Sequence, residues 1–219
     1  RSWLLVAAFG SSIAGMNLIY PALVYLPLGM ATSVQLLGPL AVALLSSLRP
    51  RNLLWSGLAI IGVGLFYLPN SITFSLPGLL FALASAVSMG IYLLLSRRAG
   101  ARSSDGSMLA LAVVWAALLI LPFGIHEAGA TLLQPNLLAA GLGLAIISAV
   151  VPYSLDLAAL RRLPPRLVGI LESLEPVVGA LAGLLILSES LALLQWAAVA
   201  CITLASVGAV VSKYEKNTL

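Results

Sequence analysis

The sequence predicts an all-α membrane protein that crosses the bilayer many times. Hydrophobic residues make up 61% of the 219 residues and charged residues only 8%, whereas a soluble domain carries about 25% charged residues. Apolar runs of about 20 residues, long enough to cross a bilayer as a helix, recur along the whole chain. The basic residues fall only between alternate runs. These three observations together indicate a polytopic helical membrane protein.

Eight apolar runs are separated by charged or turn-rich segments. The clearest separators are "RPRN" at 49–52, "RRAGARSSDG" at 97–106 and "RRLPPR" at 161–166. Arg1 precedes the first run as it would in a signal peptide, but seven further runs favour a membrane span there. The predicted spans are 3–20, 28–48, 53–69, 76–96, 107–125, 136–159, 166–187 and 191–212.

The basic residues predict the orientation of these spans. If eight helices alternate in direction, all eleven Lys and Arg residues fall on one side of the membrane. The positive-inside rule makes that side cytoplasmic, together with the C-terminus. His126, Glu127 and Glu189 fall on the other side. The net charge of +4 is thereby explained by topology, and no nucleic-acid partner is expected.

The residues needed for the other function classes are not found. Cys201 is the single cysteine, so the sequence offers no disulfide and no cysteine-ligated metal site, and Cys201 is interpreted as a packing residue. The segment "HEAGA" at 126–130 lacks the second His of a zinc protease, and no G-x-S-x-G nucleophile motif occurs. We therefore predict no enzyme, metal or cofactor; a membrane-embedded enzyme and a purely structural subunit remain the alternatives from other classes.

An internal repeat links the second and seventh predicted spans. Residues 22–45 match residues 159–182, within the segment 158–182, at an offset of 137, with eight identical pairs. Leucine and alanine matches are common in membrane sequences, but two prolines at a fixed spacing are not. Pro27 pairs with Pro164 and Pro39 with Pro176. After a slip of four residues, Trp55 also pairs with Trp196.

The repeat predicts two units of opposite orientation. The offset corresponds to five helices, an odd number, so matching helices cross the membrane in opposite directions. Such inverted repeats are the usual construction of secondary transporters. We expect residues 1–70 to hold the last three helices of a first unit and residues 74–213 a complete second unit of five. The first two helices of a ten-helix, five-plus-five protein would then be absent from this chain.

The paired prolines predict broken helices near the middle of the membrane. Proline cannot donate a hydrogen bond to the carbonyl four residues earlier, which belongs to Gln35 for Pro39 and to Glu172 for Pro176. Freed carbonyls at membrane depth require a partner in the protein or in a water-filled cavity. The sequence therefore predicts a polar site beside each proline.

Glu172 and Glu175 are the strongest candidates for binding a proton or substrate. They lie three residues apart on one helical face, with Glu175 about 13 Å from the helix start. Two buried carboxyls this close would not both carry charge. The pair could thus carry a proton or bind the ammonium of an amino acid; a structural hydrogen bond is the alternative reading of Glu172. Weaker candidates, which could equally serve in helix packing, are Asn17, its repeat mate Ser154, Gln35, Tyr92 and Tyr153.

Several motifs resemble the EamA-type branch of the drug/metabolite transporter superfamily. They are "VYLPLG" at 24–29, "GPLAVALLSSLRP" at 38–50, "PYSLDLAALRRLP" at 152–164, "ESLEPVVGAL" at 172–181 and "LSESL" at 187–191. Within that branch the resemblance is greatest to bacterial inner-membrane exporters of threonine and homoserine. It implies ten helices in two inverted repeats and export of small metabolites, with amino acids as the substrates of this subgroup.

The sequence departs from that subgroup at one pair of repeat mates. The exporters carry an acid where this chain has Gln35, and an apolar residue where it has Glu172. The leading hypothesis is a multi-pass inner-membrane exporter of small amino acids, driven by proton exchange with alternating access. A general metabolite or drug exporter of the same fold is the close alternative, and a homodimer is left open.

Overall fold

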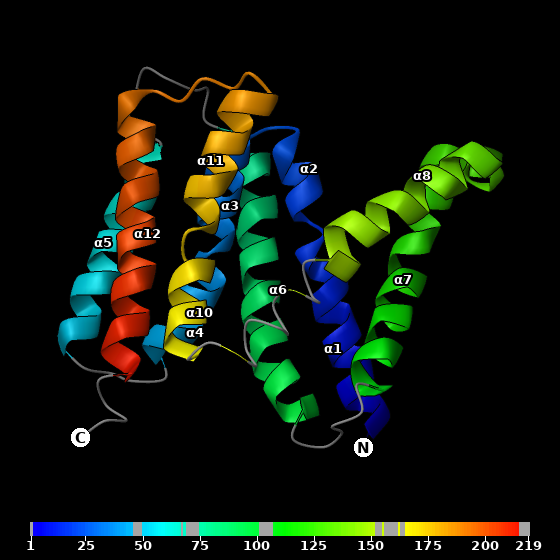
Figure 1. Cartoon of the computed structure of the whole chain (residues 1–219), viewed down its shortest axis with the longest axis horizontal. Helices are drawn as coiled ribbons and strands as arrows, with labels where there is room; N and C mark the ends of the chain where they lie inside the picture. Colours follow the sequence, from blue (N-terminus) through cyan, green and yellow to red (C-terminus); the bar gives the residue numbers. More distant parts are fainter. Residues whose placement is uncertain are drawn as a thin grey trace.

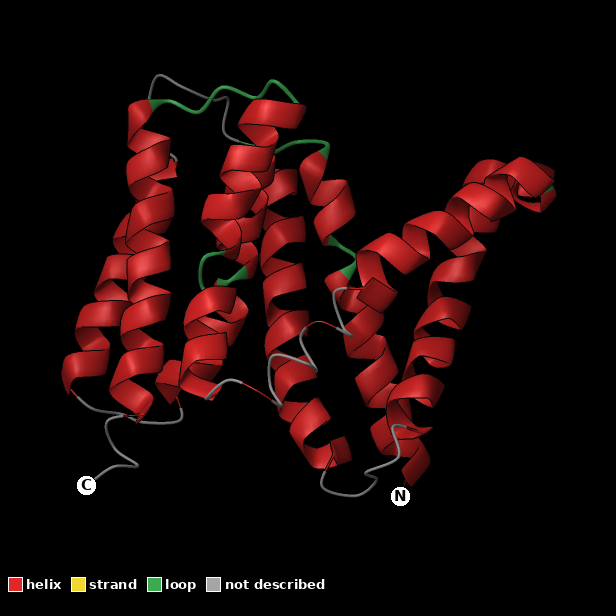
Figure 2. Cartoon of the chain, viewed as in Figure 1, coloured by secondary structure: helices red, strands yellow, loops and turns green. Residues whose placement is uncertain are grey.

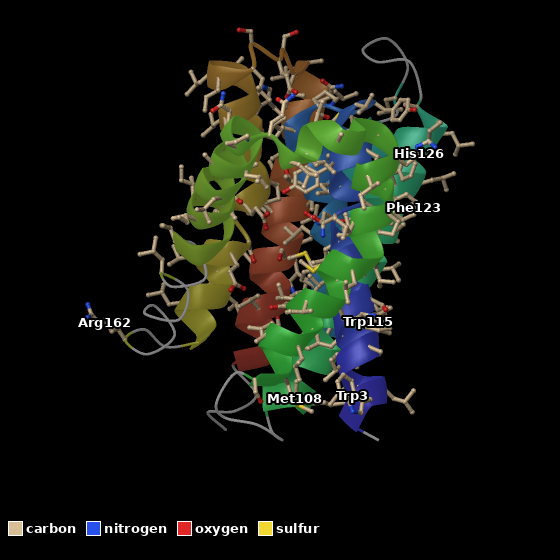
Figure 3. The ribbon with its side chains drawn as sticks, turned by 90° about the vertical axis from the view of Figure 1, so that its right-hand side faces the viewer. Trp3, Met108, Trp115, Phe123, His126 and Arg162 are labelled. Atoms are coloured by element: carbon tan, nitrogen blue, oxygen red, sulfur yellow. The ribbon has the colours of Figure 1, made fainter. Side chains whose placement is uncertain are left out.

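The computed structural model describes residues 2–45, 50–66, 68, 75–100, 107–151, 155, 162 and 165–214. These residues form helices and connecting turns, and no strand occurs among them (Figure 2). Both chain termini lie at one end of the bundle (Figure 1), which we call the terminal end. The opposite end is called the far end. Trp3 and Met108 lie toward the terminal end and His126 toward the far end (Figure 3).

The helices follow the order of the predicted spans. In chain order they are α1 (Ser2–Met16), α2 (Ile19–Leu23), α3 (Leu28–Gln35), α4 (Leu37–Leu45), α5 (Pro50–Phe66), α6 (Leu76–Gly100), α7 (Ser107–Ala128), the 3-10 helix η1 (Gly129–Leu133), α8 (Pro135–Ala145), the π-helix η2 (Ile146–Val150), α10 (Pro165–Glu172), α11 (Glu175–Ile186) and α12 (Leu193–Tyr214).

Four stretches of helix are long and apolar enough to cross a membrane. They are Trp3–Leu23, Leu76–Ser96, Ser107–Leu133 and Leu193–Ser212. Shorter apolar helices occupy Leu28–Val42, Leu53–Leu65 and Pro135–Ser148, where three further spans are predicted. The remaining predicted span, 166–187, is divided between α10 and α11. The all-helical membrane class is thus supported. Three predicted spans are interrupted: 3–20 between α1 and α2, 28–48 between α3 and α4, and 166–187 between α10 and α11.

The core of the bundle is built where helices cross closely. α1 packs between α6 and α7, and α4 packs against α6. At the α4–α6 crossing, a Cβ on Gly38 would run into the backbone carbonyl of Ala86. Only glycine therefore allows α4 to lie this near to α6. The crossing fixes α6 beside the break between α3 and α4, which is important for the site described below.

α5 and α12 form an antiparallel pair at one edge of the bundle (Figure 1). A Cβ on Gly208 would lie 2.5 Å from the Trp55 ring, so the indole lies directly on the α12 backbone. The Trp55 Nε1–H donates to Ser212 Oγ at 3.0 Å. The pairing fixes the position of α12, which in turn packs against α10 and α11.

α8 differs from the other helices because it leaves the bundle. It extends from the far end of α7 (Figure 1), and no described residue of α8 is buried. Its exposed side chains are apolar, such as Leu142 at 65% and Leu144 at 66%. An apolar helix surface of this kind is suited to lipid or to another membrane helix.

Candidate functional site

The second predicted span is broken just before Pro39. α3 ends at Gln35 and α4 begins at Leu37, so Leu36 forms the break. The Leu36 N–H still bonds to the Thr32 carbonyl at 3.0 Å, and the Leu40 N–H bonds to the Leu36 carbonyl at 3.1 Å. Pro39 has no N–H for the Gln35 carbonyl, and its ring crowds that carbonyl. The break therefore falls directly after Gln35, as the proline predicts.

The seventh predicted span has the matching break. α10 ends at Glu172 and α11 begins at Glu175, with Ser173 and Leu174 in a turn between them. The Leu174 N–H bonds to the Leu171 carbonyl at 3.0 Å, which is a tighter turn than the α-helix. Pro176 follows and is fully buried. Here too the last helical residue before the break is the one to whose carbonyl the proline offers no N–H.

The two broken helices run in opposite directions through the bundle. Along the chain, α3 and α4 run from the far end to the terminal end, while α10 and α11 run back (Figure 1). α3 packs against α11. The predicted pair of interrupted, oppositely directed helices is therefore present at Pro39 and Pro176.

Gln35 lies in a buried hydrogen-bond network. Its Nε2 donates to the Ser85 hydroxyl on α6 at 2.7 Å, and that hydroxyl donates to the Met16 carbonyl at 2.8 Å. The Met16 carbonyl lies where the chain turns from α1 into α2, because the Tyr20 N–H bonds instead to the Asn17 carbonyl at 3.0 Å. One serine thus connects the breaks of two helices, a role that the sequence analysis did not assign to it.

Asn17 and Tyr92 are near this network but make different contacts. The Asn17 Nδ2 donates to the Ile13 carbonyl of its own helix at 3.0 Å. Tyr92 on α6 is half-buried and stacks on Phe9 of α1, with ring centroids 5.4 Å apart. Asn17 therefore adjoins the network only through its neighbour Met16, and Tyr92 belongs to a separate cluster with Phe9 and Leu95. The predicted candidates Tyr153 and Ser154 lie outside the described residues.

Glu172 and Glu175 flank the second break, one on each side of its two-residue turn. The sequence analysis expected both side chains to be buried, and this expectation is wrong for the described chain, where both are exposed. The physical reason lies in the packing of the described helices, in which α10 packs against α12, and α11 packs against α3 and α12, on the faces opposite these carboxyls. The first break, by contrast, also has α6 across it.

A pair of hydroxyls joins the second break to α12. The Ser173 and Ser206 hydroxyl oxygens lie 2.8 Å apart and both residues are buried. Thr203, one turn earlier on α12, has a buried hydroxyl without a partner in the described part of the chain. Sequence reasoning missed these residues, because serine and threonine are frequent in membrane helices. The described residues bring together no group of three His, Cys, Asp or Glu side chains able to hold a metal ion.

Comparison with known proteins places the sequence of this chain in a family. Residues 76–211 match the EamA-like transporter family. The chain is 39% identical over 215 residues to the threonine/homoserine exporter RhtA of Escherichia coli strain K12, covering 96% of this chain and 72% of the relative. It is 39% identical over 204 residues to RhtA of Salmonella typhimurium strain LT2, covering 91% of this chain and 68% of the relative. No solved structure gives a significant match. The chain therefore belongs to the EamA-like transporter family.

Proposed function

We propose that this protein exports small amino acids, such as threonine and homoserine, across the bacterial inner membrane in exchange for protons. The observation that carries the proposal is the pair of proline-linked helix breaks, with Gln35 beside one and two carboxyls beside the other. The 39% identity to exporters of this substrate class supports the choice of substrate. The C-terminus lies on the cytoplasmic side in this proposal, following the distribution of basic residues.

The second break supplies the groups that an amino acid and a proton both require. The Glu172 carbonyl, for which Pro176 offers no N–H, and the Glu175 carboxyl lie at one turn. Each can accept a hydrogen bond from an ammonium group. A carboxyl that holds a proton on one side of the membrane and an ammonium group on the other couples the two movements. Gln35 cannot ionise, so the first break takes part by polar contact alone.

We further propose that two additional helices cover the exposed face of the second break. In this proposal, residues 1–70 form a unit of three helices and residues 74–213 a unit of five. In the first unit, α1, α3 and α4 are covered by α6, and α1 also by α7. The repeat mates of α1, α3 and α4 are α8, α10 and α11. A preceding helix pair, equivalent to α6 and α7, would cover these and enclose Glu172 and Glu175.

The substrate and the driving force are tested in inverted membrane vesicles. Full-length protein should take up labelled threonine when the vesicle interior is made acidic, and excess unlabelled homoserine should compete. Glu175→Gln should abolish this uptake, whereas Glu127→Gln, which changes an exposed acid of α7, should leave it intact. A Glu175→Gln variant with normal uptake would contradict the assigned role of Glu175.

A second substrate class is suggested by the positions of the acidic residues in the two repeats. Gln35 and Glu172 depart from the pattern of the threonine and homoserine exporters, which would alter the groups available to a substrate. A general metabolite or cationic drug exporter is therefore the second candidate. This second function is favoured if the same vesicles, with an acidic interior, accumulate a cationic dye and excess threonine does not reduce the accumulation of the dye.

A further inference from the structure

The far-end halves of the two broken helices meet in a seam of small residues. A Cβ on Gly29 of α3 would lie 2.6 Å from the Ala180 Cβ of α11. A Cβ on Gly179 would lie 2.9 Å from the Thr32 Oγ1. Because Gly29 and Gly179 carry no side chain, the two helices approach each other closely at these positions. We call this contact, made by Leu28, Gly29 and Thr32 of α3 with Gly179, Ala180 and Gly183 of α11, the far-end seam.

Glu189 closes the seam at its outer edge. Its carboxylate Oε2 accepts the backbone N–H of Leu28, the first residue of α3, at 2.9 Å. This contact joins residues 161 positions apart in the chain, and it satisfies an N–H that the helix itself leaves unpaired. A carboxylate is the side-chain group best suited to a helix N-terminus. Glu189 thus bonds the loop after α11 to the start of α3.

The turn after α11 is folded to place Glu189 over the seam. Ser188 has a φ of 57°, in the left-handed region that favours glycine. The N–H groups of Leu187 and Glu189 both bond to the Gly183 carbonyl, at 3.1 and 2.9 Å. A Cβ on Gly183 would collide with the Glu189 carboxylate. The turn and the glycine therefore both serve to admit this one side chain.

The other halves of the same helices do not make the matching contact. α3 and α4 both pack against α6 and α12, and α10 and α11 both pack against α12. The close α3–α11 contact, however, has no comparable counterpart between the described residues of α4 and α10. The breaks at Leu36 and at Ser173–Leu174 separate the far-end halves, which contact each other, from the terminal-end halves. They are therefore the positions at which each helix would bend in a change of conformation. In an inverted repeat, the opposite state is obtained when each unit adopts the conformation of the other. The contact between α3 and α11 would then be lost, which opens the far end, and their repeat mates α10 and α4 would come together.

We propose that Glu189 is a positioning residue that holds the far end closed during transport. Its carboxylate binds α3 to α11 in the state described here, and it releases the Leu28 N–H when the far end opens to discharge substrate. The role of Glu189 in transport rests on the proposed function. The bond between its carboxylate and the Leu28 N–H, which we call the far-end latch, is a property of the fold. It can therefore be tested without measuring transport.

The test uses disulfide cross-linking in membranes with Cys201→Ala as background. A Cβ on Gly179 would lie 3.6 Å from the Thr32 Cβ, within the usual Cβ separation of a disulfide. Thr32→Cys with Gly179→Cys therefore reports the closed far end. The repeat offset of 137 carries Thr32 onto Gly169 and Gly179 onto Val42. Gly169→Cys with Val42→Cys therefore reports the opposite state.

Glu189→Ala should slow cross-linking of the Thr32–Gly179 pair at least about fivefold, the shift expected for loss of one charge-assisted hydrogen bond. It should speed cross-linking of the Gly169–Val42 pair. Glu189→Gln should have a smaller effect, because an amide oxygen still accepts the N–H. Glu127→Ala, a change of another acid near the far end, should alter neither rate.

Gly183→Ala supplies a second, independent variant that keeps the carboxylate but displaces it. It should slow the Thr32–Gly179 cross-link in the presence of Glu189 and have little further effect after Glu189→Ala. If Glu189→Ala leaves both cross-links unchanged, or slows both together as general unfolding would, the latch is refuted. Absence of the Thr32–Gly179 cross-link in the parent protein would equally refute it. None of these outcomes depends on which substrate is exported.

Discussion

Replacing Ser85 by alanine should destabilise the protein more than replacing its neighbour Ser88. The Ser85 hydroxyl accepts a hydrogen bond from the Gln35 Nε2 at 2.7 Å and donates one to the Met16 carbonyl at 2.8 Å. Ser85 is fully buried and Gln35 is 8% exposed, so water does not reach the groups that Ser85→Ala leaves unpaired. The Ser88 hydroxyl instead bonds to the Ala84 carbonyl of its own helix at 2.8 Å, and that carbonyl keeps its helical partner when the hydroxyl is removed.

The magnitude follows from counting the two lost bonds. Hydrogen bonds between membrane helices average about 0.6 kcal/mol, while leaving a buried group unpaired costs about 1–3 kcal/mol. Ser85→Ala should therefore lower the free energy of unfolding by about 1–3 kcal/mol, and Ser88→Ala by less than about 0.5 kcal/mol.

Unfolding by sodium dodecyl sulfate in mixed micelles, followed by circular dichroism, measures both variants against the parent protein. Ser85→Cys, which retains a weak donor, should fall between the parent and Ser85→Ala. Equal losses for the Ser85→Ala and Ser88→Ala variants would refute the argument that Ser85 connects the breaks of two helices. So would a Ser85→Ala variant as stable as the parent.

Two further predictions use the same unfolding assay. Gly208→Ala should destabilise the α5–α12 pair by about 2 kcal/mol, because its Cβ would meet the rigid Trp55 ring at 2.5 Å; Gly57→Ala, with open space around it, should be neutral or slightly stabilising, and equal effects would contradict the packing described. Ser206→Ala should cost about 1 kcal/mol by removing its 2.8 Å hydroxyl contact at the second break. Thr203→Val should be neutral or stabilising because its hydroxyl has no described partner; a loss as large as that of Ser206→Ala would show that Thr203 binds something.

The helix breaks could be predicted from the sequence because their cause is local. A proline offers no N–H to the carbonyl four residues earlier, so Pro39 and Pro176 locate their own breaks. The apolar runs likewise predicted where the helices lie. Exposure of Glu172 and Glu175 was not predicted, because it depends on which helices cover α10 and α11, and a charge pattern does not contain that information.

Contacts between distant segments were also beyond the sequence. The Glu189 bond to the Leu28 N–H spans 161 residues, and the sequence analysis had only placed Glu189 on the non-cytoplasmic side. The one available signal was Gly183 six residues before it, a glycine at the end of an apolar helix, which many helices share. Ser85 gave no signal at all, since its role depends on two breaks in other helices.

The most direct test of the central claim separates proton coupling from substrate binding at the second break. Purified full-length protein in liposomes would be assayed for exchange of labelled against unlabelled threonine, and for accumulation of threonine driven by an acidic interior. The account predicts that Glu175→Gln retains exchange, which moves no net proton, because the amide oxygen and the Glu172 carbonyl still accept from the ammonium group. The variant should lose accumulation, because an amide cannot carry the proton. A variant that still accumulates threonine against its gradient would show that the proton is carried elsewhere and would contradict the account.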